Sequence, residues 1–533
     1  MLKEITLYNV RNFRGGPRKI HLSSLTILCG SNSAGKSTLL KSILFLKLNI
    51  GQIGLASQNG LRFSNEAVDL GSFETFVSSG CGSEGFAIAV TVEDQMPKQI
   101  YERLLHKMKR QQINVANSSG EADAEGLITY QLRSRFEVGY LTELGQKNNE
   151  DVNNDVGSSD GAMLTNAEFK IAVLNEEIFN WSVQRSLKNG SRCLELLVNG
   201  EDFVNELKEW GLNSVADEFD SLVADELGNV RLRCAIRGML PTRVFIENKD
   251  AINEPSGSSV GQKKAIPLPF MMADAQQDLV RTMSMVRYIG PLRAPAKRYY
   301  LSSQDASPVN DSTGQATPFT IQSQVNRKVQ NRRINAVVET ETLGSALNYW
   351  VNYLRTGNAS PTEIPGAVYT KTTADVLVEI LLAGGDGETA HALADSGFGY
   401  SQILPILVSI LTSPENTTFL IEQPELHLNP SLQVRLADFI AAMIYVGKQL
   451  IIETHSEHLV NALRVLIAET DDSYLQENSQ LYFISSSTDG PILSTLAIQE
   501  NGDIPEWPND FFGESLNLSS RLMRAQKRYI TRR

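Results

Sequence analysis

The feature that most constrains the fold is a nine-residue stretch near the N-terminus, "GSNSAGKST". It matches the pattern G-x-x-x-x-G-K-[ST] in full, and its residues are Gly30, Ser31, Asn32, Ser33, Ala34, Gly35, Lys36, Ser37 and Thr38. The apolar run Leu25–Cys29 before it predicts a buried strand, and the apolar residues after it recur at helical spacing. A strand that turns through a glycine-rich loop into a helix predicts an α/β protein.

This loop has the chemistry of a phosphate-binding site. Its glycines let backbone N–H groups turn toward an anion, and the N-terminus of the following helix adds a positive end. Lys36 can reach the β- and γ-phosphates of a nucleotide, and the Ser37 hydroxyl can ligate Mg²⁺. We therefore expect ATP and Mg²⁺ as cofactors.

The stretch "TTFLIEQPELHLNP" predicts a second half of the same site. Its apolar strand ends at Glu422, from which a carboxylate can hold phosphate-bound Mg²⁺. A second acid that activates the attacking water is expected next, but the next residue is Gln423. An amide cannot accept a proton from water, and general-base help is worth about 10²–10⁴-fold in rate. Either the site is slow, or Glu425 reaches the water by a bend around Pro424.

The apolar stretch "QLIIET" predicts a neighbouring strand, which places Thr454 and His455 at the same carboxyl edge of the sheet. An imidazole at that edge can hydrogen-bond a γ-phosphate. Before the acid strand, "DSGFGYSQILPILVSI" combines two glycines and a serine with a long apolar helix, which makes it a candidate signature loop. The candidate residues in this loop are Gly397, Gly399, Ser401 and Gln402.

The order of these motifs predicts that the two ends of the chain supply one α/β sheet around an inserted region. Between about residues 75 and 280 the hydrophobic pattern weakens, and clusters of Gly, Ser, Asn and Asp predict long surface loops. The expected segments are 1–75 (first part of the ATPase head), 76–284 (inserted region), 285–465 (second part of the head) and 466–533 (C-terminal extension with a basic tail).

Charge and composition limit the partners. The net charge of −12 argues against a protein that coats nucleic acid along its whole surface. The tail "RLMRAQKRYITRR" and the segment "NRKVQNRR" are locally basic, and each is either a solvated face or a contact with phosphates or an acidic partner. No apolar run approaches the roughly 20 residues that span a membrane, and the N-terminus lacks a signal core. We expect a cytoplasmic protein with no membrane contact.

The phosphate loop, signature-like loop, acid strand and strand-end histidine, in this order around an insertion, resemble the ABC-type ATPase heads of the SMC, RecF and OLD-like group. Within that group, five stretches resemble bacterial AAA-family ATPases that carry a C-terminal domain of unknown function. These stretches are "VDLGSFE", "YIGPLR", "SGFGYSQILPI", "IEQPELHLNP" and "PEWPNDFFGE". Relatives of this type occur in anti-phage defence systems, including Septu-like and retron-associated ones.

The resemblance implies a role for each motif residue. Lys36 and Ser37 bind phosphate and Mg²⁺. Glu422 stands at the position of the Walker B aspartate and is expected to contact the metal as that residue does. Gln423 stands where these heads carry the catalytic glutamate, and His455 is the switch histidine. Arg11 to Phe13 resemble the segment that packs on the nucleotide base, and Gln52 and Gln58 are candidates for the Q-loop.

The resemblance also implies an assembly. The signature loop of such a head contacts the γ-phosphate held by the opposite subunit, so we expect a homodimer or higher oligomer that closes around ATP. The loop in this chain departs from the usual LSGG form. The expected function is a slow ATPase that switches an effector protein, such as a nuclease, in anti-phage defence.

Three alternatives come from other classes. A RecF/SMC-like DNA-repair ATPase needs a basic groove and would be stimulated by DNA. An OLD-like nuclease needs a metal-binding acid cluster, and "ETDDSY" (Glu469–Tyr474) lacks a strand-borne partner glutamate. A scaffold would bind ATP without turnover.

Overall fold

The computed structural model divides the chain into two compact units. The first comprises Met1–His21 and Lys41–Val286, and the second comprises Leu22–Leu40 and Arg287–Arg533. The residues described are 1–51, 61–65, 68–97, 127–140, 162–173, 176–188, 191–199, 204, 208, 229–246, 264–268, 270–301, 311–359, 368–373, 377–382, 390–395, 398–487, 490–508 and 514–531.

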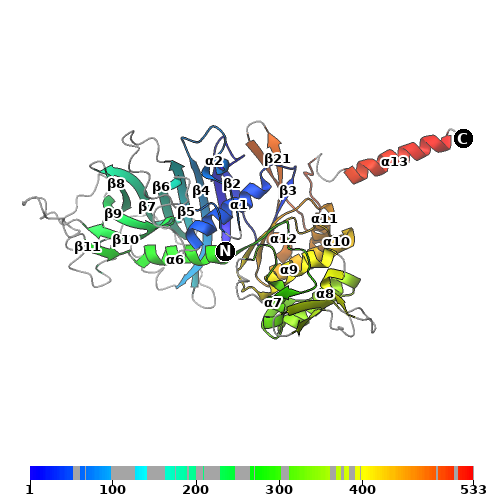
Figure 1. The fold of residues 1–533 in the computed structure, drawn as a ribbon. Coiled ribbons are helices and arrows are strands. Elements are labelled where there is room, and N and C mark those ends of the chain that lie inside the picture. Colours follow the sequence, from blue (N-terminus) through cyan, green and yellow to red (C-terminus); the bar gives the residue numbers. More distant parts are fainter. Residues whose placement is uncertain are drawn as a thin grey trace, which may run out of the picture. The chain divides into compact units, whose positions relative to one another are not determined.

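The first unit is built on a ten-stranded sheet with the order β11-β10-β9-β8-β7-β6-β5-β4-β1-β2 (Figure 1). Its strands are β1 (Leu2–Tyr8), β2 (Arg18–His21), β4 (Phe86–Pro97), β5 (Leu127–Tyr140), β6 (Ala162–Val173), β7 (Glu176–Lys188), β8 (Ser191–Asn199), β9 (Asn229–Arg237), β10 (Leu240–Ile246) and β11 (Lys264–Pro267). Every neighbouring pair is antiparallel. Buried and more exposed positions alternate along much of β6, as expected for a strand with one face on a core.

Aromatic side chains and two helices complete the core of this unit. The Phe45 ring lies 5.1 Å from that of Phe63 and 5.3 Å from that of Phe76, measured between centroids. Helix α2 (Phe73–Phe76) contributes to this cluster, and helix α6 (Phe270–Ser284) is tied to the sheet by polar contacts. The Tyr130 hydroxyl hydrogen-bonds Asp278.

The two units divide the chain differently from the segments expected from the sequence. Strand β1 pairs with β4, with Ile5 opposite Val90, so the first strands join the sheet of the middle region and not the phosphate-loop strand. The region expected to be rich in loops supplies strands β4 to β11. Its hydrophobic pattern is weak because antiparallel strands with one exposed face need few consecutive apolar residues.

The second unit is built on a six-stranded mixed sheet with the order β12-β19-β20-β3-β21-β22. The strands are β3 (Leu25–Gly30), β12 (Val286–Ile289), β19 (Thr418–Glu422), β20 (Gln449–Glu453), β21 (Ser479–Ser487) and β22 (Gly490–Leu496). Strands β19, β20, β3 and β21 are parallel, and β22 returns antiparallel to β21. The α/β class with a mixed sheet and flanking helices is confirmed.

The described helices of the second unit, apart from α1, follow here in chain order. They are α7 (Thr317–Gln324), α8 (Leu343–Thr356), α9 (Phe398–Thr412), α10 (Pro430–Tyr445), α11 (Glu457–Glu469), α12 (Tyr474–Glu477) and α13 (Glu514–Thr531). A 3₁₀ turn, Leu393–Asp395, precedes α9, and a π-helical turn, Lys47–Gly51, follows helix α1 (Lys36–Leu46), which begins in the second unit and ends in the first.

The predicted alternation of helix and strand before His455 is confirmed by α9, β19, α10, β20 and α11. The predicted cap is also confirmed, because the Asn429 side chain accepts a hydrogen bond from Leu432 N–H at 2.9 Å and Pro430 starts α10. The predicted apolar face of α10 is buried and includes Phe439, whose ring lies 5.1 Å from that of Trp350.

Two small sheets lie outside the main one. The first contains β13 (Tyr300–Leu301), β16 (Val368–Thr373), β17 (Leu377–Leu382) and β18 (His391–Ala392), and the second pairs β14 (Lys328–Arg332) with β15 (Val338–Thr342). The basic segment at β14 is partly structural, because the Arg333 guanidinium forms a 2.6 Å ion pair with Glu341. Among the described residues, no helix combines the length and the apolar character needed to cross a membrane.

Candidate nucleotide-binding site

The predicted phosphate loop joins β3 to α1 in the second unit. Gly30 and Gly35 have φ values of 134° and 111°, and Ser33 between them has a φ of 61°. A Cβ atom on Gly30 would lie 1.9 Å from the carbonyl oxygen of Ile484 on β21, so only glycine fits there. Strand β21 thus fixes the start of the loop, while Ser31 to Ser33 remain exposed at its tip.

Lys36 lies at the first position of α1 and is buried beneath the loop. Its Nζ donates to the carbonyl oxygens of Gly30 at 3.1 Å and Ser31 at 2.7 Å. Burial lowers the pKa of Lys36, and the nearby Glu453 carboxylate opposes this shift. The ammonium group is therefore held inside the concave side of the loop by groups that an anion could replace.

Ser37 contacts an acid that the sequence analysis did not select. Its hydroxyl donates to Oε2 of Glu453 at 2.7 Å. Glu453 is the last residue of β20, which lies beside β3, and only 5% of it is exposed. The signal was present in the sequence, because Glu453 ends an apolar run just as Glu422 does.

Glu422 ends β19, one strand farther from the phosphate loop. It pairs in register with Glu453, which in turn pairs with Leu28 of β3. Adjacent strands are about 4.8 Å apart, so Glu422 lies one strand spacing beyond Glu453. Tyr288 of β12 lies near the Glu422 side chain, and burial together with this carboxylate raises the pKa of Tyr288.

Gln423 follows Glu422 in an unusual backbone conformation. Its φ is 43°, a left-handed value that is costly for a residue with a side chain. Its N–H donates to the carbonyl oxygen of Glu453 at 2.8 Å. Nη2 of Arg293 donates to the carbonyl oxygens of Glu422 and Gln423 at 3.2 and 3.3 Å. Hydrogen bonds from two other segments therefore hold this turn.

Arg293 is itself a buried charge, with 5% of its surface exposed. Burial lowers the pKa of Arg293 to about 10, and Glu425 opposes this shift. Within the described part of the chain, its Nε and Nη1 atoms have no hydrogen-bond partner. Arg293 and Tyr288 lie in "YIGPLR", which the sequence analysis used only for the resemblance.

Glu425 braces the segment that carries the candidate histidine. Its Oε1 accepts the backbone N–H of His455 at 2.7 Å. Burial raises the pKa of Glu425, and this hydrogen bond opposes the shift. The side chain is turned toward the backbone after β20.

His455 lies at the carboxyl edge of the sheet, as the strand order predicts, and it is exposed. Partial burial of the ring and the nearby charge of Lys36 lower its pKa. The imidazole is therefore neutral at neutral pH, and it can donate or accept a hydrogen bond. Lys36, Ser37, Glu453 and His455 all lie at this one edge of the second unit.

The candidate signature residues are at the start of α9. Gly399 is half-buried, whereas Ser401 and Gln402 are 4% and 1% exposed. Both side chains therefore lie inside the second unit and not on its surface. Gly397 falls outside the described residues, as do Gln52 and Gln58.

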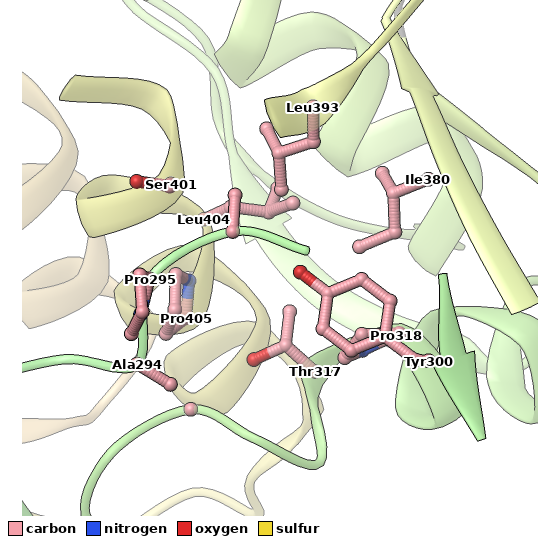
Figure 2. Close-up of a pocket in the computed structure, with 12 residues that line it drawn as sticks. Ala294, Pro295, Tyr300, Thr317, Pro318, Ile380, Leu393, Ser401, Leu404 and Pro405 are labelled. Carbon is pink, nitrogen blue, oxygen red and sulfur yellow. The ribbon is translucent and has the colours of Figure 1, made fainter. Parts of the chain in front are cut away.

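A small recess of about 20 Å³ lies beside α9 (Figure 2). Ser401, Leu404 and Pro405 of α9 line one side of it, and Tyr300 and Thr317 are among the residues on the other. A volume of this size has room for about one water molecule. We interpret the recess as a packing gap beside the helix.

Arg11 and Phe13 belong to the first unit, whereas the phosphate loop belongs to the second. The Phe13 ring is fully buried in its own unit, so it is not offered for stacking on a base. Nη2 of Arg11 donates to the carbonyl oxygen of Leu70 at 2.7 Å.

The donor set of this edge fits a magnesium nucleotide. Mg²⁺ prefers oxygen ligands and usually binds one or two carboxylates together with phosphate oxygens. The hydroxyl of Ser37 and the carboxylates of Glu453 and Glu422 are such ligands. Within the described residues, no group of three or more His, Cys, Asp or Glu could hold a metal ion, so phosphate oxygens would have to complete the coordination.

Family models match two parts of the chain. Residues 288–461 match the model described as "AAA domain, putative AbiEii toxin, Type IV TA system", and residues 476–522 match "Protein of unknown function (DUF3696)". The first match contains Arg293, Glu422 and His455, and it supports an ATPase domain of the AAA type. Among curated proteins, none matches the chain.

Several solved structures are similar to the chain at low identity. The SMC head domain from Thermotoga maritima is 10% identical with a TM-score of 0.33, over 93% of this chain and 98% of that one. The SmcHead bound to the C-winged helix domain of ScpA is 10% identical with a TM-score of 0.35, over 93% of this chain and 98% of that one. The Smc head domain bound to the C-terminal domain of ScpA, derived from Pyrococcus furiosus, is 9% identical with a TM-score of 0.33, over 93% of this chain and 96% of that one.

We predict that Arg293 stabilises the turn at Gln423. Replacing Arg293 with Met removes two hydrogen bonds to buried carbonyl groups, and an unsatisfied buried acceptor costs about 1–3 kcal/mol. The free energy of unfolding, measured with denaturant, should fall by about 2–3 kcal/mol. Arg298→Met is the matched control, because the Arg298 side chain is 68% exposed; its effect should stay within about 0.5 kcal/mol. Equal effects of the two changes would contradict the role of Arg293.

Proposed function

We propose that this protein binds ATP with Mg²⁺ at the phosphate loop, hydrolyses it slowly, and uses the ATP-bound state to switch a partner. The observation that carries the proposal is the complete phosphate loop with Lys36, Ser37, a buried acid and His455 at one sheet edge. The match of residues 288–461 to an AAA domain supports the same class.

Each residue has a defined task in this proposal. The loop N–H groups and Lys36 bind the β- and γ-phosphates, and Lys36 leaves the carbonyl groups of Gly30 and Ser31 to do so. Bound Mg²⁺ would neutralise charge that develops on the phosphates. His455 hydrogen-bonds the γ-phosphate, and Glu425 holds the His455 backbone in place for that contact.

Slow turnover follows from the groups near the expected water. Gln423 has no proton-accepting carboxylate, and the turn that carries it is fixed by Arg293 and by the carbonyl oxygen of Glu453. Glu425 is buried, and its Oε1 is engaged by the His455 N–H. We therefore assign Glu425 to positioning and not to proton transfer, and the ATP-bound state lasts long enough to signal.

The signalling role rests on the family resemblance. The matched family model is described as a putative AbiEii toxin of a type IV toxin–antitoxin system, and the sequence motifs resemble ATPases of anti-phage defence systems. We propose an oligomer that closes around ATP and controls an effector protein, such as a nuclease, in this setting. Strong stimulation of turnover by DNA would instead favour a DNA-repair ATPase.

The first functional prediction concerns Lys36. Lys36→Ala removes the charge that faces the phosphates, and hydrogen bonds to charged groups contribute about 1.5–3 kcal/mol. Affinity for a fluorescent ATP analogue should fall by about 10–100-fold. Lys371→Ala, an exposed lysine of the same unit, is the control. Wild-type affinity in Lys36→Ala would contradict the assignment of the phosphate loop.

The second functional prediction concerns assembly of the protein into an oligomer. An interface that closes around a ligand is stabilised by the binding free energy of that ligand. ATP, more than ADP, should raise the sedimentation coefficient of the wild-type chain, and Lys36→Ala should not respond. A wild-type chain that binds ATP but stays monomeric at every concentration would overturn the dimer.

The third functional prediction concerns Gln423 and the rate of hydrolysis. Gln423→Glu restores a proton acceptor, so single-turnover hydrolysis should become faster, by up to about 10²–10⁴-fold. Glu425→Gln keeps an oxygen for the His455 N–H and should change the rate little. Loss of hydrolysis in Glu425→Gln with intact ATP binding would show that Glu425 is the base. Fast wild-type turnover unaffected by either change would show that this strand is misassigned.

A further inference from the structure

Glu453 is the acid that reaches the phosphate loop in this structure. The Glu453–Ser37 hydrogen bond of 2.7 Å joins β20 to the start of α1. Ser37 occupies the position from which a phosphate-loop hydroxyl ligates Mg²⁺. The Ser37 hydroxyl donates its hydrogen bond to the carboxylate, so the lone pairs of the hydroxyl oxygen remain available to a metal. This hydrogen bond therefore orients Ser37 as a ligand.

Glu422, the acid expected for this task, is placed differently. It lies on the strand beyond β20, and Tyr288 of β12, the strand on its other side, lies near its carboxylate. Glu453 is in addition close enough to Lys36 to raise the pKa of that ammonium against the effect of burial. Of the two acids, Glu453 is the one that interacts with both Lys36 and Ser37.

The charges at this edge favour a cation. Glu422 and Glu453 are only 8% and 5% exposed, and they pair in register on adjacent strands. Two buried carboxylates one strand spacing apart repel each other, and a divalent cation stabilises both. The nearby cation Lys36 donates to the loop carbonyl groups of Gly30 and Ser31.

We propose that Glu453 is the acid of the magnesium site. Its carboxylate positions Ser37 and helps to hold the Mg²⁺ that accompanies the bound nucleotide. This inference rests on the ATP-binding function proposed above. Glu422 has the weaker, more distant role. Because Ser37 lies on the metal side of the phosphates, Glu453 does not replace the base that is missing at Gln423. The assignment is therefore consistent with a site that binds magnesium nucleotide well and turns it over slowly.

The experiment measures how much Mg²⁺ strengthens nucleotide binding. The affinity for a fluorescent ATP analogue is determined with Mg²⁺ and with EDTA, and the ratio of the two affinities is compared between wild type, Glu453→Gln and Glu422→Gln. Loss of a carboxylate that orients a metal ligand costs about 10–100-fold in metal affinity. The ratio should fall by about that factor in Glu453→Gln, whereas the affinity in EDTA should not fall. Glu422→Gln should keep most of the ratio.

Glu415→Gln, an exposed acid just before β19 at the opposite end of that strand, should behave as wild type. The affinity of the ATP complex for Mn²⁺, followed by electron paramagnetic resonance, gives a readout that does not depend on turnover. If Glu453→Gln does not fold, Glu453→Asp provides the same test, because a shorter carboxylate should weaken Mn²⁺ binding while ATP still binds in EDTA.

The outcomes separate the two proposals. A wild-type ratio in Glu453→Gln, or a larger loss in Glu422→Gln, would overturn the assignment of Glu453 and leave ATP binding intact. A wild-type chain that does not bind ATP with or without Mg²⁺ would overturn the proposed function, and the inference with it.

Discussion

The second unit depends on the insertion of strand β3 between β20 and β21. Backbone hydrogen bonds on both sides of β3 pair residues near the N-terminus with residues near the C-terminus, such as Ile27 with Ile452 and with Leu481. Because these strands are parallel, their carboxyl ends meet at one edge. Gly30, Glu453 and Glu422 all end strands at this edge, so a pairing register formed by apolar residues sets the distances between polar ones.

Three residues at this edge adopt states that are unfavourable in free energy unless neighbouring groups stabilise them. Gln423 has a left-handed backbone, Arg293 is buried as a cation, and Glu425 is buried as an acid. Each cost is reduced by one of the others, because Arg293 donates to the carbonyl group of Gln423 and interacts with the charge of Glu425. Strain and buried charge of this kind cluster at functional sites, where they hold groups ready for a ligand. The turn after β19 is thus held by contacts within the protein itself.

Local patterns in the sequence predicted the elements of this unit well. The phosphate loop, the strand that ends at Glu422 and the capped helix that starts at Pro430 each have a short-range signal, such as glycine spacing, an apolar run or an Asn-Pro pair. Alternating strands in the first unit were missed, because their exposed positions carry polar residues. Strands β1 and β2 lie in the sheet of the first unit, and local patterns do not show this because strand pairing is a long-range property.

The sequence by itself determined which residues can bind phosphate and which strands end in acids, since those properties depend on residue type and near neighbours. It determined the loss of a carboxylate at Gln423 for the same reason. Only the tertiary structure decided that Glu453 and not Glu422 contacts Ser37, that Glu425 is turned toward the His455 backbone, and that Phe13 is a core residue. These outcomes depend on the order of strands in a sheet and on burial, which arise from contacts between residues that are distant in the chain, such as Ser37 and Glu453 at 416 positions and Glu425 and His455 at 30.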